Sequence, residues 1–348
     1  MIVVNCRFLA QERTGVQRFA EEITRELVEL RDDLTLVAPP GELRYEKIGN
    51  VRVARVGTSQ GHRWEQLDLP RFLRRTHDSP LLLSLMNTGP VLYRNQIVTH
   101  HDLTYVRFPA TYTRKFRVGY RMLSRATLRH ARRVLTVSEF SRSEIAAVYG
   151  IPTDRISVIP NAAGAAFQQA HAGETTPPYM LAVSSLLPHK NIDFLATAFQ
   201  RYAEESGTTT VLKLVGAPQA EKVGGRVEAS DSSHIDFLGR VSDEELVELY
   251  AHARAFIFPS LYEGFGIPPI EAQAAGLPVI AAAAASIPEV LGASALYFDP
   301  TDEEQLIGQI CELDTREAAR NKYRSLGFEN AQRFSWRTSA AQLSSLLT

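Results

Sequence analysis

The sequence predicts an α/β protein with two doubly wound parallel-sheet domains. Short β-branched segments such as IVVN (2–5) and YMLAVSS (179–185) alternate with amphipathic helical stretches. This alternation is the pattern of βαβ units in a parallel sheet that helices cover on both faces. The length of 348 residues also exceeds the roughly 100–200 residues of one ordinary domain. Two such domains, facing each other, would leave a cleft between the carboxyl ends of their strands, where ligands of these sheets bind.

The first series of βαβ units is expected over residues 1–165. Its strands are predicted at 2–5, 34–39, 51–56, 81–86, 96–100, 133–138 and 156–161. Its helices are predicted at about 16–30, 63–75 and 112–131, with a fourth that ends at Tyr149.

The second domain is expected over residues 166–334, and its series of strands follows a small, polar, proline-ended connection, AAGAAFQQAHAGETTPP (162–178). Its strands are predicted at 179–185, 211–216, 234–239, 255–260, 278–282 and 295–298. Helices are expected to begin at Ile192, Asp243 and about Pro268, and three helical stretches finish the chain. Residues 335–348 are expected to form a helix that packs back on the first domain.

The charge is distributed unevenly between the two halves. Lys and Arg number 25 against 16 Asp and Glu through residue 165, and 13 against 23 after it. The first half is therefore suited to an anionic partner. No run of about 18 apolar residues occurs and the first strand begins at Ile2, so we expect a cytoplasmic protein without a cleaved signal peptide. Two distant cysteines, Cys6 and Cys311, predict neither a disulfide framework nor a metal site.

The segment PSLYEGFGIPPIEAQAAGLPVIAA (259–282) predicts a site for anions and hydroxyls. Its glycines allow the backbone to approach a ligand, and Pro268 and Pro269 suit the first turn of a helix. A helix start offers free N–H groups and a partial positive charge to a diphosphate. Glu263 in the loop and Glu271 in the first helical turn can each accept two hydrogen bonds from a vicinal diol. We therefore favour a sugar-nucleotide site over a tight turn with a capping glutamate.

The chain resembles the retaining glycosyltransferases of family 4, which share the GT-B architecture of two Rossmann-like domains. The resembling segments, in chain order, are RTGVQRFAEEI, VTHHDLTYVRFPATY, LTVSEFSRSEI, VIPN, LLPHKNIDFLATAF, FLGRVSDEELVELY, FIFPSLYEGFGIPPIEAQAAGLPVIAA, IPEVLG and FSWRTSA. The resemblance points to the branch that builds bacterial surface polysaccharides, including O-antigen, often from GDP-mannose. It implies transfer of a hexose from a nucleotide sugar to a polyprenyl-linked or oligosaccharide acceptor. Residues 1–165 would bind the acceptor, and residues 166–334 the nucleotide sugar.

The same resemblance assigns roles to individual residues. It makes Lys190 the cation that neutralises the departing diphosphate. Many relatives carry an arginine a few residues before this lysine, but here Ser184 and Ser185 precede it, and His189 stands where arginine is frequent. Glu263 would bind hydroxyls of the donor sugar without acting as a nucleophile. Further donor-binding positions are Glu271, Gly264, Phe265, Gly266, Ile267, Arg240, Val241 and Gly15.

His101 follows the strand 96–100 at its carboxyl end, and the family pattern His-Asp selects it as a catalytic residue. It is expected to face the donor sugar and to ease charge in the transition state, with Asp102 fixing its orientation. The neighbouring His100 leaves two alternatives open: the other histidine acts, or the pair is only structural.

The sequence predicts no metal and no other cofactor. It contains no D-x-D triplet and no His/Cys cluster with ligand spacing. Positive charge at the leaving diphosphate would then come from Lys190, the backbone N–H groups of 263–267 and the helix dipole. The resemblance implies front-face substitution, in which the leaving phosphate takes the acceptor proton and configuration is retained.

A basic helix is predicted within 112–131. Nine Arg and Lys residues and no acidic residue occur between Arg107 and Arg133. Arg117, Arg121 and Arg125 recur at intervals of four and so share one helical face. This face would rest on the anionic inner membrane or hold the diphosphate of a lipid-linked acceptor, unless it is simply solvated. Nucleic acid is not expected, because base-stacking aromatics are not interleaved with the arginines.

Three alternatives stay open at this point. The donor could be a UDP-sugar. The chain could be another enzyme of the same architecture, a sugar-nucleotide epimerase or a phosphorylase. It could also bind nucleotide sugars without catalysis.

Overall fold

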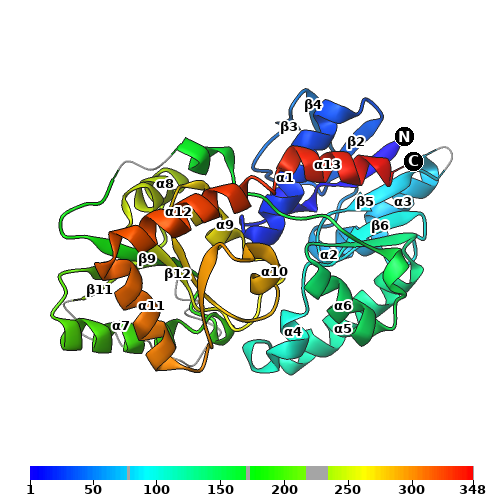
Figure 1. Ribbon diagram of the computed structural model, residues 1–348. Coiled ribbons are helices and arrows are strands. Elements are labelled where there is room, and N and C mark those ends of the chain that lie inside the picture. The colour runs from blue at the N-terminus through cyan, green and yellow to red at the C-terminus, as the bar shows by residue number, and fades with distance from the viewer. Residues whose placement is uncertain (77–78, 170–172, 217–233, 348) are drawn as a thin grey trace. The chain divides into compact units, whose positions relative to one another are not determined.

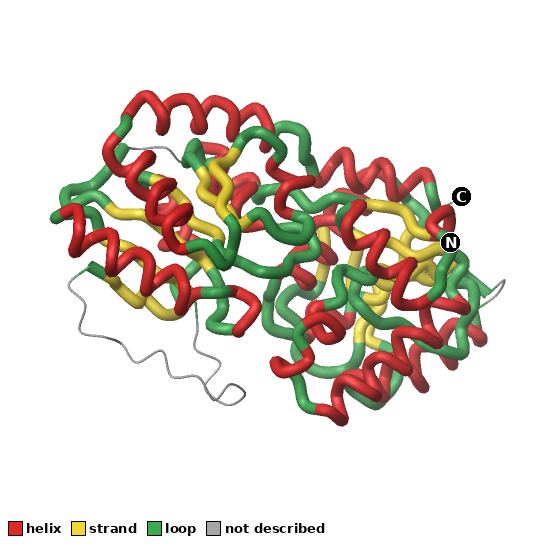
Figure 2. The backbone as a smooth tube through the Cα atoms, turned by 60° about the horizontal axis from the view of Figure 1, so that its bottom comes forward, coloured by secondary structure: helices red, strands yellow, loops and turns green. Residues whose placement is uncertain are grey.

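The computed structural model describes residues 1–76, 79–169, 173–216 and 234–347, and the predicted connection 162–178 therefore lies partly outside the described residues. The chain divides into two units, each with its own parallel sheet and covering helices (Figures 1 and 2). Unit 1 comprises Met1–Leu103, Arg114–Asn161 and Ser335–Thr348, and unit 2 comprises Thr104–Thr113 and Ala162–Phe334. The prediction of two doubly wound α/β sheets is confirmed. Thr104–Thr113, expected in the first domain, clusters with unit 2.

The sheet of unit 1 has eight strands in the spatial order β3-β4-β2-β1-β5-β6-β7-β8. Neighbours are parallel except for the hairpin of β3 and β4. The strands are β1 (Ile2–Asn5), β2 (Leu34–Ala38), β3 (Lys47–Ile48), β4 (Val51–Arg55), β5 (Leu81–Ser84), β6 (Gln96–Thr99), β7 (Arg133–Thr136) and β8 (Ile156–Val158). The helices are α1 (Gly15–Leu30), α2 (Gly61–Arg63), α3 (Leu69–Arg75), α5 (Arg114–His130), α6 (Glu139–Tyr149) and α13 (Trp336–Ser345).

The hydrophobic pattern of unit 1 explains these elements. All residues of β1, β5 and β6 are buried, as a parallel sheet between two helical layers requires. Helix α1 buries Phe19, Ile23 and Leu27 at intervals of four, which places them on one face. Trp336 of α13 meets the Phe19 ring edge-on, with ring centroids 6.1 Å apart. The terminal helix thus packs on α1, within unit 1.

The sheet of unit 2 has six parallel strands in the order β11-β10-β9-β12-β13-β14. The strands are β9 (Tyr179–Val183), β10 (Val211–Val215), β11 (Ile235–Gly239), β12 (Ala255–Phe258), β13 (Val279–Ala282) and β14 (Ala295–Phe298). The helices are α4 (Thr104–Arg107), α7 (Ile192–Ser206), α8 (Asp243–His252), α9 (Ile267–Ala274), α10 (Ile287–Leu291), α11 (Glu303–Thr315) and α12 (Glu317–Ala331). The predicted elements agree with these to within a few residues, but β3, α4 and α10 were not predicted.

The strand order reverses once in each sheet. In unit 2 the chain starts at β9, moves outward to β11, and then returns to β12 on the other side of β9. In unit 1 the reversal lies between β1 and β5. At such a reversal the two neighbouring loops at the carboxyl ends run in opposite directions and leave a crevice for a ligand. The topology therefore indicates one candidate position in each unit.

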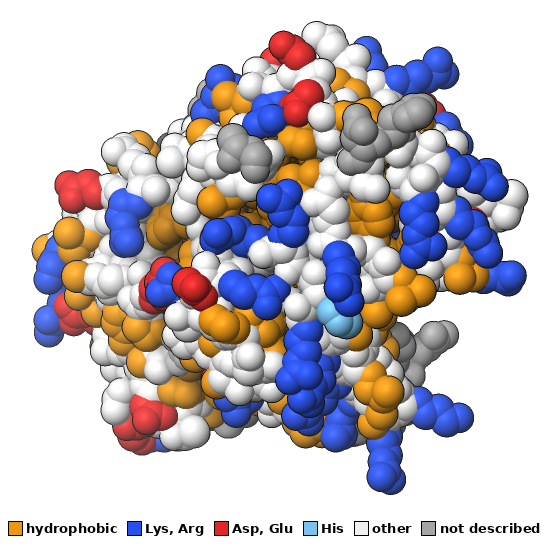
Figure 3. All heavy atoms as spheres, turned by 90° about the vertical axis from the view of Figure 1, so that its right-hand side faces the viewer, with side chains coloured by type: hydrophobic (Ala, Val, Ile, Leu, Met, Phe, Trp, Pro, Cys, Tyr) orange, Lys and Arg blue, Asp and Glu red, His pale blue; other side chains and the backbone are white. Residues whose placement is uncertain are grey.

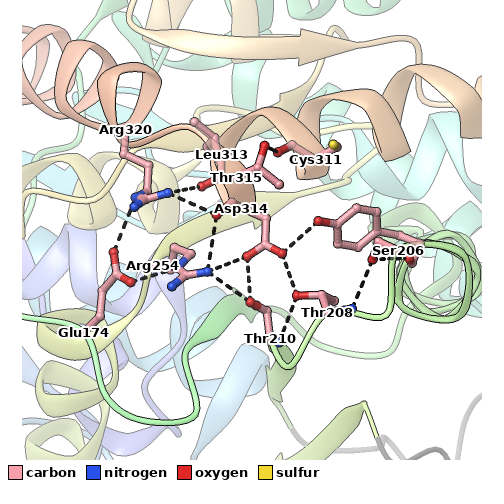
Figure 4. Close-up of polar contacts among 11 residues, drawn as sticks. Glu174, Ser206, Thr208, Thr210, Arg254, Cys311, Leu313, Asp314, Thr315 and Arg320 are labelled. Atoms are coloured by element: carbon pink, nitrogen blue, oxygen red, sulfur yellow. Dashed lines mark hydrogen bonds and ion pairs between the residues drawn. The ribbon is translucent and has the colours of Figure 1, made fainter.

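A network of buried polar groups lies at the opposite, amino end of the unit 2 sheet (Figure 4). The carboxylate of Asp314, in α11, accepts hydrogen bonds from Tyr202 and Thr208 at 2.8 and 2.7 Å. It also accepts from Thr210, just before β10, at 2.6 Å and from Arg254, just before β12, at 2.7 Å. Asp314 thereby joins two strand starts to two helices.

Glu174 extends this network to the connection between the two series of strands. Its carboxylate lies 2.8 Å from Arg254 Nε and 3.4 Å from Arg320 Nε (Figure 4). Arg320 also donates to the carbonyl groups of Leu313 and Asp314 at 2.9 and 3.1 Å. The connecting segment is therefore fastened to the end of unit 2 that lies away from the carboxyl ends of the strands.

We expect Asp314→Asn to lower the free energy of unfolding by about 3 kcal/mol near neutral pH, because Arg254 loses a buried partner. Burial alone would raise the pKa of Asp314, but hydrogen bonds, from Thr210 and Thr208 above all, hold it below its ordinary value. A lowered folded pKa stabilises the protein above the unfolded value of about 4, and this contribution is lost as pH falls through the folded value. Asp314→Asn should therefore flatten the acid dependence of stability.

Urea unfolding between about pH 7 and pH 2 measures both effects. Asp236→Asn, on an exposed position of β11, is the matched control. An equal loss in both variants, or an unchanged acid slope in Asp314→Asn, would contradict the assignment.

Candidate functional site

Two predicted site residues meet at the reversal of strand order in unit 2. Lys190 ends a short 3-10 turn (Pro188–Lys190) after β9, and Glu263 lies in the loop after β12. Lys190 Nζ donates to Glu263 Oε1 at 2.6 Å, and the two side chains are 19% and 14% exposed. The backbone N–H of Leu261 also donates to the carbonyl of His189 at 2.8 Å, which fastens the loops together. A cation and a carboxylate are thus presented side by side at the carboxyl ends of adjacent strands.

The Glu263 loop is fixed from beneath by Ser286, which the sequence did not single out. Its buried hydroxyl donates to the carbonyl groups of Glu263 at 3.0 Å and Phe265 at 3.2 Å. Gly266 closes the loop with a φ of +97°, and a Cβ there would lie 2.7 Å from Ile287 Cδ1. The dihedral angle therefore favours glycine at this position, and a Cβ there would also displace the terminal methyl group of Ile287. In the sequence, Ser286 could have been found only from the segment ASIPE, in which a serine precedes a helix start.

Glu271 lies deeper in the helix than predicted. Helix α9 begins at Ile267, so Glu271 is its fifth residue, beyond the first turn. The reason is that the two prolines occupy the second and third helical positions, where a missing N–H costs nothing. Glu271 is only 2% exposed. Its contact with a donor sugar stays a prediction.

The remaining predicted positions of the loop lie around this helix start. Gly264, Phe265 and Gly266 are buried, and Ile267 is half-buried. The Phe265 ring meets Phe334 edge-on at 5.3 Å between centroids. Phe265 therefore anchors the loop, while its backbone N–H and those of its neighbours stand at the start of α9.

Arg240 and Val241 follow β11, at the edge of the sheet, and β10 separates β11 from β9. The backbone at Gly216, after β10, lies very close to the backbone after β9, because a Cβ on Gly216 would lie 1.7 Å from the Ser184 carbonyl oxygen. The N–H of Gly216 donates to the carbonyl of Gly239 at 2.8 Å. The sequence did not single out Gly216, which keeps the ends of β9, β10 and β11 close.

In unit 1, both histidines after β6 are buried. His101 is 5% exposed, its Nε2 lies 3.2 Å from the carbonyl of Leu85, and its ring meets Phe19 edge-on at 4.9 Å. His100 Nδ1 lies 3.3 Å from the carbonyl of Asn87. Burial lowers the pKa of both imidazoles, that of His100 to about 4, although Asp102 acts in the opposite direction. Both rings are therefore neutral near pH 7.

A buried ion pair that the sequence did not reveal lies at the strand reversal of unit 1. Arg7 follows β1 and is 4% exposed, and its Nε lies 3.3 Å from Oε1 of the fully buried Glu65. Thr88 accepts from Arg7 at 3.0 Å and donates to Glu65 at 2.7 Å, and Asn5 donates to Glu65 at 3.0 Å. Burial alone would raise the pKa of Glu65, but Arg7, His62 and Thr88 hold it below its ordinary value. Because Arg7 and Glu65 are 58 residues apart in the sequence, no local sequence pattern indicates this pair.

Arg7 also lines a pocket of about 420 Å³. The pocket lies after β1 and β2, at the carboxyl edge of the unit 1 sheet. Its other lining residues are Ala10, Gln11, Pro39, Pro40, Glu42, Gln60 and Gly61. The predicted Gly15 is the exposed first residue of α1, where the Gln17 side chain accepts from the Thr14 N–H at 3.2 Å. Gly15 does not line this pocket.

Helix α5 shows one difference from the predicted basic face. Arg121 and Arg125 are exposed, whereas Arg117 is half-buried. Val118 and Met122, 54% and 68% exposed, stand among the arginines, so the outer face is both basic and apolar. Figure 3 shows the right-hand side of Figure 1, where Lys and Arg side chains are many and Asp and Glu few.

Within the described ranges, no three His, Cys, Asp or Glu side chains are grouped so that they could hold a metal ion. Over the same ranges, no helix has the length and apolar character to cross a membrane.

Comparisons with known proteins identify the family to which this chain belongs. The family model described as "Glycosyl transferases group 1" matches residues 165–345, and "Glycosyltransferase Family 4" matches residues 13–163. The chain therefore belongs to the glycosyltransferases of family 4, and the resemblance drawn from its motifs is confirmed.

Among its relatives is the O-antigen chain mannosyltransferase RfbU of Salmonella typhimurium, 30% identical over 321 residues that cover 87% of this chain and 88% of RfbU. O-antigen chain mannosyltransferase B of Escherichia coli is 30% identical over 273 residues, 73% of this chain and 71% of that protein. The solved structure of WaaG, a glycosyltransferase involved in lipopolysaccharide biosynthesis, matches with a TM-score of 0.73, 16% identity and complete coverage of both chains. That likeness establishes the GT-B fold.

Proposed function

We propose that this chain is a retaining, metal-independent mannosyltransferase that uses GDP-mannose and extends a polyprenyl-linked or oligosaccharide acceptor. The observation that carries the proposal is the Lys190–Glu263 pair, 2.6 Å apart at the strand reversal of unit 2 and next to the start of α9. The similarity to two O-antigen mannosyltransferases supports mannose as the sugar.

The pair suits a donor that carries both a diphosphate and hydroxyl groups. In the structure, the ammonium of Lys190 and the carboxylate of Glu263 satisfy each other. With the donor bound, Lys190 would turn to the diphosphate and Glu263 would accept hydrogen bonds from the sugar hydroxyls. The N–H groups at the start of α9 would add positive potential to the same diphosphate. Lys190 would thus bind the negatively charged diphosphate, and Glu263 would accept hydrogen bonds from the hydroxyl groups of the same ligand.

In the proposed reaction, the bond between the anomeric carbon and the diphosphate oxygen breaks as Lys190 stabilises the departing charge. The acceptor oxygen bonds to the anomeric carbon on the same face, and its proton passes to the departing phosphate oxygen. Because burial lowers the pKa of His101, its imidazole is neutral near pH 7 and would not serve as a general acid in this reaction. Configuration is retained because the leaving and entering oxygens occupy one face.

GDP-mannose at about 100 times its Kd should stabilise the chain by about 2.7 kcal/mol. A thermal-shift screen of GDP-mannose, UDP-glucose and ADP-glucose in EDTA measures this, because a metal-independent site keeps its affinity there. Lys190→Gln and Glu263→Gln should each weaken donor binding about 10-fold or more, since each removes a charge-assisted contact.

Asp236→Asn, on an exposed position of β11, is the control for the loss of a charge within unit 2. A shift that EDTA abolishes would contradict metal independence. A shift with UDP-glucose alone would replace the proposed donor. That second candidate has one specific observation in its favour, a solved structure of HepE from Anabaena in complex with UDP and glucose, which matches with a TM-score of 0.73 at 16% identity.

We further propose that the pocket at Arg7 in unit 1 receives a sugar of the acceptor. The charge of Arg7 is already balanced by Glu65, and Glu42 adds a negative charge at the pocket. An anionic group would therefore find no net attraction, whereas the amides of Gln11 and Gln60 and the carboxylate of Glu42 suit neutral hydroxyls. This charge balance favours a carbohydrate over a phosphate.

Saturation-transfer NMR with a mannose trisaccharide tests the pocket. Gln60→Ala combined with Glu42→Ala should reduce the sugar signals several-fold, because two hydroxyl partners are lost. Asp32→Ala, an exposed position at the amino end of β2, should leave them unchanged. Full signals in the double variant, or displacement of the sugar by inorganic phosphate, would contradict the assignment.

The outer face of α5 suggests how the chain would meet a lipid-linked acceptor. Val118 and Met122 can enter the headgroup region while the surrounding arginines, including Arg121 and Arg125, pair with anionic lipids. Each exposed cation contributes about 1 kcal/mol near such a surface. We propose peripheral attachment to the cytoplasmic face of the inner membrane through this helix.

Replacing Arg121, Arg125 and Arg129 by Gln should reduce flotation with vesicles of about 30% anionic lipid at least 10-fold, since about 3 kcal/mol of attraction is lost. Arg117 is kept, because it is half-buried. The control replaces Arg71, Arg74 and Arg75, exposed residues on or at the end of α3, and removes the same charge. Equal loss in both variants would indicate a general charge effect and would contradict the role of α5.

A further inference from the structure

A ten-residue segment from the first half of the chain belongs structurally to unit 2. Thr104–Thr113 follows His101 and Asp102, precedes α5, and clusters with the second sheet. It is compact, because the N–H of Phe108 donates to the carbonyl of Thr104 at 2.8 Å and the N–H of Thr111 donates to that of Phe108 at 3.1 Å. Thr104, Tyr105 and Thr111 are buried. We call this segment the strap.

One side chain of the strap reaches both loops that carry the Lys190–Glu263 pair. The ring centroid of Phe108 lies 5.5 Å from that of His189 and 6.0 Å from that of Tyr262, both in tilted geometry. His189 directly precedes Lys190, and Tyr262 directly precedes Glu263. His189 and Tyr262 are 4% and 5% exposed. Phe108 is therefore a shared neighbour of the residue before each member of the pair.

Two features make this contact more than the filling of a core. The loops after β9 and β12 are irregular, and they are joined by the Lys190–Glu263 pair and by the hydrogen bond from the Leu261 N–H to the His189 carbonyl. Aromatic pairs in tilted geometry also fix orientation as well as separation, and each contributes about 0.5–1.5 kcal/mol beyond its buried area. A ring that touches both loops limits their relative movement. The distance between Lys190 and Glu263 depends on that movement.

We infer that Phe108 is a positioning residue that holds Lys190 and Glu263 in register for the diphosphate and the sugar of one donor. The inference rests on the proposed function, since it concerns the same pair. Phe108 acts through His189 and Tyr262, and it need not touch the donor itself. A shift of about 1 Å in a positioned group is enough to reduce turnover strongly.

The test is a double-mutant cycle on donor affinity and turnover. It uses wild type, Phe108→Ala, Lys190→Gln and the double variant, titrated with the sugar nucleotide that stabilises the wild type most. Phe108→Ala should lower kcat about 10-fold or more for the folded enzyme. In the Lys190→Gln background the same change should have little further effect, because the positioned partner is already lost. A purely structural role would give the same loss in both backgrounds.

Two further variants separate positioning from loss of stability. Phe108→Tyr keeps the ring and should retain kcat within about two-fold. Phe328→Ala removes a phenyl group that is 46% exposed on α12 and should leave kcat unchanged. Unchanged turnover in Phe108→Ala, or full additivity with Lys190→Gln, would overturn this inference alone. Failure of every tested sugar nucleotide to bind the wild type would instead overturn the proposed function.

Discussion

The reversal of strand order in each sheet is the constraint on which the rest of this protein depends. A parallel sheet places all its carboxyl-end loops on one edge, and only at the reversal do neighbouring loops diverge enough to admit a ligand. In unit 2 this position lies between β9 and β12 and receives Lys190 and Glu263, which are 73 residues apart in sequence. In unit 1 it lies between β1 and β5 and receives Arg7 and Thr88. The charged side chains of Lys190, Glu263 and Arg7 therefore lie at the positions where the strand order of each sheet leaves space for a ligand.

The two edges of the unit 2 sheet differ in character: a buried polar network lies at the amino edge, and partly exposed charges lie at the carboxyl edge. At the amino edge, Asp314 accepts four hydrogen bonds from side chains and is nearly buried. A fully satisfied buried network of this kind specifies one arrangement and resists local opening. At the carboxyl edge, the loops are held by Ser286, by the hydrogen bond from Leu261 to His189 and by the ring of Phe108. Lys190 and Glu263 lie at this carboxyl edge and are partly exposed, so a ligand can reach them.

The sequence predicted what depends on local pattern. Buried β-branched runs located the strands, and the glycines and prolines around Glu263 located a helix start, because these residues act through their own backbone. Small position errors arose where local rules allow several helix starts, as at Glu271, which lies just beyond the first helical turn that was predicted for it. The elements β3, α4 and α10 are too short to show a period. The Arg7–Glu65 pair and the place of Phe108 depend on which distant segments pack together, and no local pattern carries that information.

The division of the chain into units has a practical consequence for dissecting the protein. Because the strap and the terminal helix each belong to the unit opposite their sequence neighbours, the chain passes between the units four times, after Leu103, Thr113, Asn161 and Phe334. A truncated fragment that stops at Asn161 would carry the strap without its sheet and would lack the helix that covers Phe19. Separate expression of either half by a single cut would therefore leave apolar surface uncovered on both products. Circular permutation, or co-expression of the terminal helix as a peptide, would preserve these contacts better than simple truncation.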